Sequence, residues 1–264
     1  MYIAPYILLW SVRASKAGTG REWQMDSARI FDELWPGGLR FRTGEGSFRL
    51  STDSVLLAAF VKDIRAQRIL DLGCGAGVLT VLLSEARPDA RVEGVELQPE
   101  QAALCRENLR ENGLSSSGVV CGDLRDHRSL FPAGAYDLVV SNPPYFAENS
   151  GLSAPDGRRA AAREERFCTL SELCAAAKYL CRWGGSFAVV YRPERLSELF
   201  CTMTGNGLEP KRLRMVQHRV SAPPSLVLAE ARRGGRPGLT VEPPLLLTDD
   251  AGGDSPEIRT IYHR

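Results

Sequence analysis

The sequence lacks the features that mark metal proteins, disulfide scaffolds and membrane proteins. Its seven cysteines include no C-x-x-C pair, and its three histidines, His127, His218 and His263, lie far apart. This spacing predicts neither a metal site nor a disulfide framework. The apolar residues 1–10 are too few to span a bilayer and follow no basic residues, so we expect no membrane helix or secretory signal. An odd number of unpaired cysteines is typical of the reducing cytosol, so we expect a cytoplasmic protein.

The sequence also lacks a strong overall charge, because 33 lysines and arginines balance 32 acids to a net +1. The charge is nevertheless uneven. Residues 67–150 hold 7 basic and 12 acidic side chains, whereas residues 158–236 hold 15 basic and 7 acidic ones. A basic C-terminal part is a candidate surface for a polyanion such as RNA, although arginines can equally form a solvated face.

One stretch organises the rest of the chain: the apolar run from Asp137 stops abruptly at Asn142-Pro143-Pro144-Tyr145. Leu138, Val139 and Val140 suit a strand that is buried on both faces. The two prolines cannot donate hydrogen bonds to a sheet, so the strand must end near Asn142. In open α/β sheets, ligands bind at the carboxyl ends of the strands. The Asn142 amide and the Pro143 carbonyl could accept both hydrogens of an exocyclic amine there, while Tyr145 stacks on its ring.

A second motif, Asp71-Leu72-Gly73-Cys74-Gly75-Ala76-Gly77, separates a predicted strand, 68–72, from a predicted helix, 78–86. Glycines at a helix N-terminus let a ligand approach the backbone closely. The spacing D-x-G-x-G-x-G is not the dinucleotide fingerprint, since Val78 stands where a third glycine would be.

Two further strands are predicted to end in acids at the same edge of the sheet. Strand 91–96 ends in Glu96, at the distance from Asp71 at which a nucleotide-binding fold reads a ribose diol. Strand 118–121 is followed by Asp123, which could accept a hydrogen bond from an adenine amine. We therefore expect these side chains to gather at one site.

Together these motifs resemble the class I S-adenosylmethionine-dependent methyltransferases over roughly residues 39–232. More narrowly, residues 51–57 and the segment 255–262 are similar to the bacterial tRNA(Val) adenine-6-amino methyltransferase family. The resemblance implies a Rossmann-like α/β fold with a mostly parallel sheet and an antiparallel last strand. It also implies methylation of an adenine amine in tRNA next to the anticodon. The catalytic residues it implies are Asn142, Pro143, Pro144 and Tyr145, and the S-adenosylmethionine ligands are Asp53, Asp71, Gly73, Gly75, Gly77, Glu96, Asp123 and Asn142.

The remaining chain completes the predicted organisation. Residues 1–24 precede Met25 and are expected to be an N-terminal extension or a misassigned start, and 25–264 a single, monomeric methyltransferase domain. Within it we expect a preface of hairpin and helix, 39–63, a core, 67–232, and an extended tail, 233–264. The hairpin is predicted to pair 39–42 with 47–50, and the helix to run through 55–60. The long polar segment 147–168 is expected to bind RNA. The RNA-binding residues predicted there and near 212 are Arg158, Arg159, Arg163, Arg166, Lys211, Arg212 and Arg214.

Two other functions are compatible with the motifs. A protein glutamine amide is also a conjugated nitrogen that the Asn-Pro-Pro-Tyr geometry could serve. The chain could alternatively be a cofactor-binding or RNA-binding protein without catalysis, but such a protein needs no group that polarises an amine. The basic C-terminal part favours RNA as the substrate.

Overall fold

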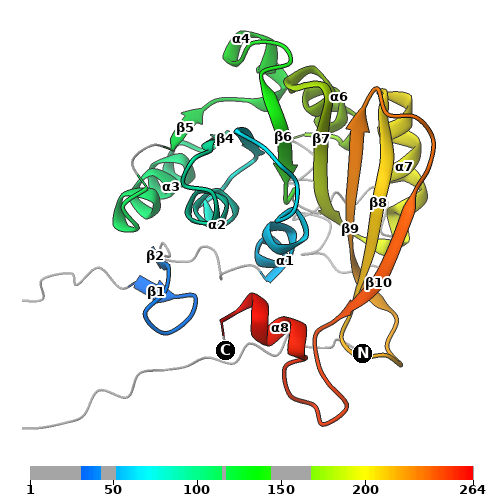
Figure 1. Ribbon diagram of the computed structural model, residues 1–264. Coiled ribbons are helices and arrows are strands. Elements are labelled where there is room, and N and C mark those ends of the chain that lie inside the picture. The colour runs from blue at the N-terminus through cyan, green and yellow to red at the C-terminus, as the bar shows by residue number, and fades with distance from the viewer. Residues whose placement is uncertain (1–30, 43–51, 115–116, 144–167, 264) are drawn as a thin grey trace, which may run out of the picture.

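An eight-stranded sheet forms the centre of the computed structural model, which describes residues 31–42, 52–114, 117–143 and 168–263 (Figure 1). The strand order is β10-β8-β9-β7-β6-β3-β4-β5. The strands are β3 (Arg68–Leu72), β4 (Arg91–Glu96), β5 (Gly118–Cys121), β6 (Tyr136–Ser141), β7 (Cys181–Tyr191), β8 (Leu208–Gln217), β9 (Pro224–Arg233) and β10 (Thr240–Leu246). The helices beside them are α1 (Thr52–Phe60), α2 (Val78–Ala86), α3 (Pro99–Glu111), α4 (His127–Leu130), α6 (Leu170–Leu180), α7 (Leu196–Gly205) and α8 (Pro256–Ile261).

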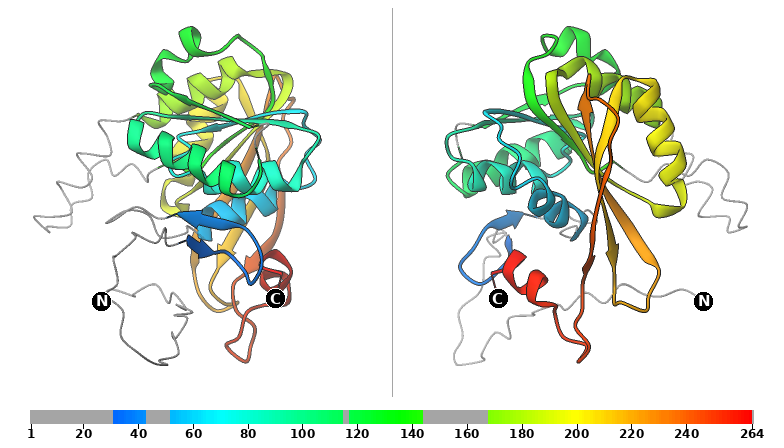
Figure 2. Two further views of the ribbon diagram at one scale, coloured as in Figure 1. Left: turned by 90° about the vertical axis from the view of Figure 1, so that its left-hand side faces the viewer. Right: turned by 45° about the vertical axis from the view of Figure 1, so that its right-hand side comes forward.

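Strand direction confirms the predicted fold class. β5, β4, β3, β6 and β7 pair in parallel, and β9 runs antiparallel to β7 and to β8. Parallel strands need helical crossovers, which here place α2 and α3 on one face of the sheet and α6 and α7 on the other (Figures 1 and 2). None of the described helices is both long and apolar enough to cross a membrane.

The core is divided between the two faces because side chains alternate along each strand. Along β6, Leu138 and Val140 pack with α1 and α2, whereas Val139 packs with α6 and α7. All three are fully buried. This confirms that the run before Asn142 is a strand covered on both sides.

The N-terminal preface differs in part from the prediction. β2 (Arg40–Arg42) pairs antiparallel with β1 (Phe31–Glu33), an upstream partner that the sequence did not indicate. The predicted partner, 47–50, lies outside the described residues. The predicted helix is present as α1. Two asparagines at the end of α3 bind the β2 backbone: Oδ1 of Asn112, which directly follows the helix, accepts from Arg40 N at 2.9 Å, and Asn108 Oδ1 accepts from Arg42 N at 2.7 Å.

The tail is more ordered than its Gly, Pro and Asp content predicts. β10 joins the sheet in parallel beside β8. α8 then begins at Ser255, whose hydroxyl accepts a hydrogen bond from Ile258 N. Ile258 is buried, and α8 lies beside the preface, where the rings of Trp35 and His263 are 4.4 Å apart (Figure 1). β10 and α8 therefore form with only a few apolar residues and one helix cap, because β10 pairs with the open edge of the sheet and α8 packs against the preface.

We expect Arg214→Ala to lower the free energy of unfolding by about 1 kcal/mol, the upper part of the range for accessible ion pairs. Its guanidinium, on β8, donates two hydrogen bonds to the Glu257 carboxylate of α8, at 2.6 and 2.7 Å. Urea denaturation measures the change. Arg219→Ala is the matched control, because Arg219 is exposed at the turn after β8. Equal stability of the two variants would show that this ion pair does not secure α8.

Candidate active site

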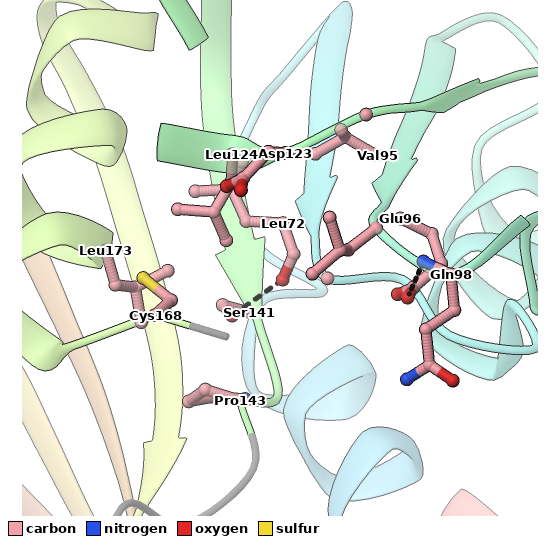
Figure 3. Close-up of a pocket in the computed structure, with 13 residues that line it drawn as sticks. Leu72, Val95, Glu96, Gln98, Asp123, Leu124, Ser141, Pro143, Cys168 and Leu173 are labelled. Atoms are coloured by element: carbon pink, nitrogen blue, oxygen red, sulfur yellow. Dashed lines mark hydrogen bonds between the residues drawn. The ribbon is translucent and has the colours of Figure 1, made fainter. Parts of the chain in front are cut away.

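A cavity lies at the point where the sheet reverses its strand order (Figure 3). From β3 the chain proceeds to β4 and β5 on one side, and then returns to place β6 on the other side. Crevices at such switch points are the usual ligand sites of open α/β sheets. The cavity is lined by Leu72, Gly73, Val95, Glu96, Leu97, Gln98, Gly122, Asp123, Leu124, Ser141, Pro143, Cys168 and Leu173.

The glycine motif forms the turn between β3 and α2, as predicted. Gly75 and Gly77 have positive φ angles of 52° and 89°, which residues with a side chain rarely adopt. A Cβ on Gly77 would also lie 2.3 Å from the Cys105 sulfur of α3. Glycine at position 77 therefore allows both the backbone turn and the close approach of α3.

Glu96 lies at the end of β4 and lines the cavity, where the sequence predicted an acid. It is 8% exposed, and its two carboxylate oxygens accept hydrogen bonds from Gln98 N (Figure 3) and from Gly75 N, each at 2.9 Å. The carboxylate thus connects the glycine loop to the start of α3. Each oxygen retains the capacity to accept a further hydrogen bond from a ligand hydroxyl.

Asp123 also lines the cavity, one strand further along the edge. Its carboxylate accepts hydrogen bonds from the backbone and side chain of Arg125. The Arg125 side chain thereby holds the pKa of Asp123 below its usual value, so this carboxyl group is ionised at neutral pH. The sequence predicts that Asp123 accepts a hydrogen bond from an adenine amine, and an ionised carboxylate is able to do so.

Asp71 is a predicted cofactor ligand at the end of β3, and its side chain is not among those that line the cavity. It is 1% exposed and accepts a hydrogen bond from Thr80 Oγ1 of α2 at 2.7 Å. Successive side chains of a strand point to opposite faces, so Leu72 reaches the cavity and Asp71 turns toward the helix. Burial raises the pKa of Asp71 to about 7. In this structure the Asp71 carboxyl group therefore binds the start of α2, and its contact with the cofactor stays a prediction.

Asn142 follows the end of β6 at the edge of the cavity, between two lining residues, Ser141 and Pro143. The Ser141 hydroxyl donates to the Leu72 carbonyl at 2.8 Å, which joins the ends of β6 and β3 (Figure 3). The Asn142 side chain donates from Nδ2 to Ser54 Oγ of α1 at 2.9 Å. The other two predicted catalytic residues, Pro144 and Tyr145, lie outside the described residues.

Several lining residues were not predicted from the sequence. Leu97 and Leu124 directly follow Glu96 and Asp123, so their position at strand ends was a usable signal. Cys168, two residues before α6, and Leu173 of α6 line the cavity opposite Glu96 (Figure 3). Nothing in their local sequence marks them, because only the crossover of the chain brings α6 to this edge.

Two of the predicted RNA contacts, Arg212 and Arg214, form ion pairs within the chain, and their contact with RNA stays a prediction. Arg212 lies between the carboxylates of Glu230 and Glu242 and over the Phe60 ring, with its guanidinium carbon 4.4 Å from the ring centroid. Arg214 is bound to Glu257. Sequence alone could not distinguish such arginines from solvated ones, since their partners lie on other strands and on α8.

The remaining predicted site residues are exposed, half-buried or outside the described residues. Lys211 donates to the Arg236 carbonyl at an exposed position. Asp53 is half-buried in the first turn of α1, beside Ser54. The predicted arginines of the long polar segment, Arg158, Arg159, Arg163 and Arg166, lie outside the described residues.

Asn108 links the preface to the glycine loop. We therefore expect its loss to affect both the stability of the fold and the binding of the cofactor. The Asn108 side chain is fully buried, and Nδ2 donates to the Ala76 carbonyl at 2.8 Å while Oδ1 accepts from Arg42 N. We expect Asn108→Ala to lower the free energy of unfolding by about 1–3 kcal/mol, because two buried backbone groups lose their partner. It should also weaken cofactor binding, since the loop loses a support.

The matched control for Asn108 is Asn112→Ala. Asn112 also binds the β2 backbone through both ends of its amide, to Arg40, but no hydrogen bond joins it to the glycine loop. Calorimetric titration should therefore find weaker binding in Asn108→Ala and unchanged binding in Asn112→Ala. Equal affinities in both variants would refute the coupling.

Comparisons with known proteins identify the family of the chain. Residues 44–156 match the family model of the methyltransferase small domain. A tRNA1(Val) (adenine(37)-N6)-methyltransferase of Porphyromonas gingivalis is 34% identical over 193 residues, which cover 70% of this chain and 75% of the relative. A relative of the same name from Tolumonas auensis is 30% identical over 213 residues, covering 80% and 86%.

Solved structures agree with the fold. A predicted O-methyltransferase from Agrobacterium tumefaciens superposes with a TM-score of 0.66 at 23% identity, over 80% of this chain and 96% of that one. A likeness at this identity concerns the fold alone. The identity and coverage of the curated relatives extend further: this chain is a methyltransferase and belongs to the tRNA1(Val) (adenine(37)-N6)-methyltransferase family.

Proposed function

We propose that the protein transfers a methyl group from S-adenosylmethionine to the exocyclic amine of an adenine in tRNA. The relatives' names make adenine 37 of tRNA1(Val) the substrate to test. The observation that carries this proposal is the position of Asn142 and Pro143 at the edge of a cavity whose far side carries Glu96 and Asp123. The residues proposed to bind the cofactor and those proposed to polarise the amine thus lie at one switch point.

The cavity residues fit S-adenosylmethionine chemically. Glu96 offers two carboxylate oxygens for a ribose diol, and the ionised Asp123 offers an acceptor for an adenine amine. Leu97 and Leu124 provide apolar surface for the base. Gly73 of the glycine loop lines the cavity, and its lack of a side chain lets a ligand approach the backbone closely. When bound, the cofactor supplies an electrophilic methyl group on its sulfonium.

The protein's part in the transfer is alignment and polarisation of the nucleophile. An adenine amine is a weak nucleophile, because its lone pair is delocalised into the ring. If Asn142 Oδ1 and the Pro143 carbonyl each accept one amine hydrogen, the nitrogen becomes more pyramidal and its lone pair turns toward the methyl group. Holding the two groups in line accounts for much of the rate gain in such displacements. A histidine base is not required.

Methyl transfer by the purified protein tests the proposal. Transcribed tRNA1(Val), the same transcript with guanine at position 37, and a glutamine-containing peptide are each incubated with S-adenosylmethionine. Products are digested and identified by mass spectrometry. We expect N6-methyladenosine from the first substrate alone. A methylated glutamine amide would identify a protein methyltransferase, and binding of RNA and cofactor without any product would identify a non-catalytic protein.

RNA affinity should fall steeply with salt, because contacts to phosphates release counterions. We expect charge reversal at Arg158, Arg159, Arg163 and Arg166 to weaken tRNA binding and reduce this salt dependence. Arg214→Ala should change tRNA affinity little, since the Arg214 guanidinium already donates to the Glu257 carboxylate. Filter binding between 50 and about 200 mM salt measures both effects. Salt-independent binding, or binding that is insensitive to these reversals, would remove residues 158–166 from the RNA surface.

A further inference from the structure

Ser54 is a buried polar residue that the proposed mechanism does not use. It lies on the first turn of α1, outside the glycine loop, and is 4% exposed. Its hydroxyl oxygen accepts the hydrogen bond from Asn142 Nδ2 at 2.9 Å, although 88 residues separate the two in sequence. A buried hydrogen bond between two distant segments, with one partner at the site of chemistry, is the strongest candidate for a further role in this molecule.

The bond has a chemical consequence because the two ends of a carboxamide are different. Nδ2 can only donate and Oδ1 can only accept. In the structure the Ser54 hydroxyl accepts from Nδ2, so the bond restrains the plane of the amide and Oδ1 faces away from Ser54. Flipping the Asn142 side chain by 180° would bring Oδ1 toward Ser54 and direct Nδ2 to the place that Oδ1 now holds. A donor at that place would repel an incoming amine hydrogen.

The residues that follow Ser54 on α1 are buried, so the backbone that bears its hydroxyl is held in place. Its neighbours on α1, Val55, Leu56 and Leu57, are each at most 3% exposed. They pack into two clusters shared with α2 and the sheet. On the other side, the Ser141 hydroxyl ties the residue before Asn142 to β3. Both partners of the hydrogen bond therefore sit on backbone that is held independently of any substrate.

We propose that Ser54 is a positioning residue, which holds the Asn142 carboxamide in the orientation that presents Oδ1 to the target amine. This inference rests on the proposed function of Asn142 and extends the methyl-transfer site to the preface. The first turn of α1 thus acts on the chemistry through a hydrogen bond and does not itself contact the reacting atoms.

Ser54→Ala removes the acceptor and should lower the single-turnover rate of tRNA methylation about 5- to 10-fold, the factor that corresponds to one neutral hydrogen bond. The affinities for S-adenosylmethionine and tRNA should stay within about 2-fold of the wild type, because the bond orients only the amine acceptor. Ser84→Ala is the matched control. Ser84 is equally buried and bonds to Ser117 on the far side of α2, so its loss should not change the rate.

A double-mutant cycle separates positioning from a general structural effect. If Ser54 acts only through the amide, Ser54→Ala should have no further effect in an Asn142→Ala background. An equal loss of rate in both backgrounds would overturn the proposal. So would a wild-type rate in Ser54→Ala.

An NMR arm tests the hydrogen bond without turnover, so it distinguishes failure of this inference from failure of the proposed function. The side-chain amide signal of Asn142 is assigned by its loss in Asn142→Asp. We expect its hydrogens to exchange with solvent more slowly in the wild type than in Ser54→Ala. Unchanged exchange would overturn the role of Ser54, whether or not tRNA is methylated. If the exchange is faster in Ser54→Ala but the wild type methylates no tRNA, the role of Ser54 in positioning Asn142 would be supported and tRNA would be excluded as the substrate.

Discussion

Replacing Asn142 with alanine should reduce the rate of methyl transfer by about 10²- to 10³-fold, the scale of losing one aimed transition-state hydrogen bond. The variant should still fold, because β6 ends at Ser141 and its core residues are untouched. Cofactor affinity should change little, since the acceptors proposed for the cofactor, Glu96 and Asp123, stay in place. Single-turnover assays on tRNA, with cofactor affinity measured separately by calorimetry, distinguish a chemical defect from a binding defect.

Asn142→Asp is the sharper variant. It keeps an oxygen acceptor of the same size, and the Ser54 hydroxyl can donate to the new carboxylate as readily as it accepts from the amide. The added negative charge would lie near the cofactor's sulfonium and stabilise the ground state, so we expect binding to survive and the rate to fall. Asn206→Ala, at the end of α7, is the control for a general loss of an asparagine. Wild-type rates in both Asn142 variants would show that this residue is only structural.

Glu96→Ala should weaken S-adenosylmethionine binding by about 1–3 kcal/mol, which is the cost of losing a buried polar partner. Part of this loss has a structural origin, because Glu96 also receives hydrogen bonds from Gly75 and Gln98. Glu96→Gln separates the two effects. It preserves the volume of the side chain and one acceptor oxygen, so the loop should keep more of its shape while the charge is lost.

The control for Glu96 is Glu100→Ala. Glu100 is exposed on α3, four residues further along the chain, and does not line the cavity. Calorimetry should find unchanged affinity in this control, the largest loss in Glu96→Ala and an intermediate loss in Glu96→Gln. Wild-type affinity in both Glu96 variants would remove this residue from the cofactor site.

Local patterns in the sequence predicted the elements that build the site with unusual accuracy. Strands 68–72, 91–96 and 118–121 and helix 78–86 begin and end where they were expected. Each of the three strands is followed or ended by a polar or glycine residue, and parallel strands with helical crossovers must align their carboxyl ends. Local signals therefore placed Glu96, Asp123 and Asn142 at one edge without any knowledge of long-range contacts.

The sequence does not reveal which distant residues a side chain will bind. Asp71 is predicted at the cofactor, and the structure adds a hydrogen bond from Thr80 that local sequence does not indicate. Arg212 and Arg214 looked like a basic patch, yet carboxylates from β9, β10 and α8 pair with them. The partner of β2 and the order of the tail were missed for the same reason, because each requires a surface that exists only once the sheet has formed.

Nucleoside mass spectrometry of tRNA from cells that lack this gene tests the central claim most directly. tRNA1(Val) is isolated from the parent strain, from the deletion strain, and from deletion strains that carry the wild-type or the Asn142→Ala gene. We predict that N6-methyladenosine at position 37 is lost on deletion, is restored by the wild type and stays absent with Asn142→Ala. Unchanged N6-methyladenosine in the deletion strain, or full restoration by Asn142→Ala, would contradict the account.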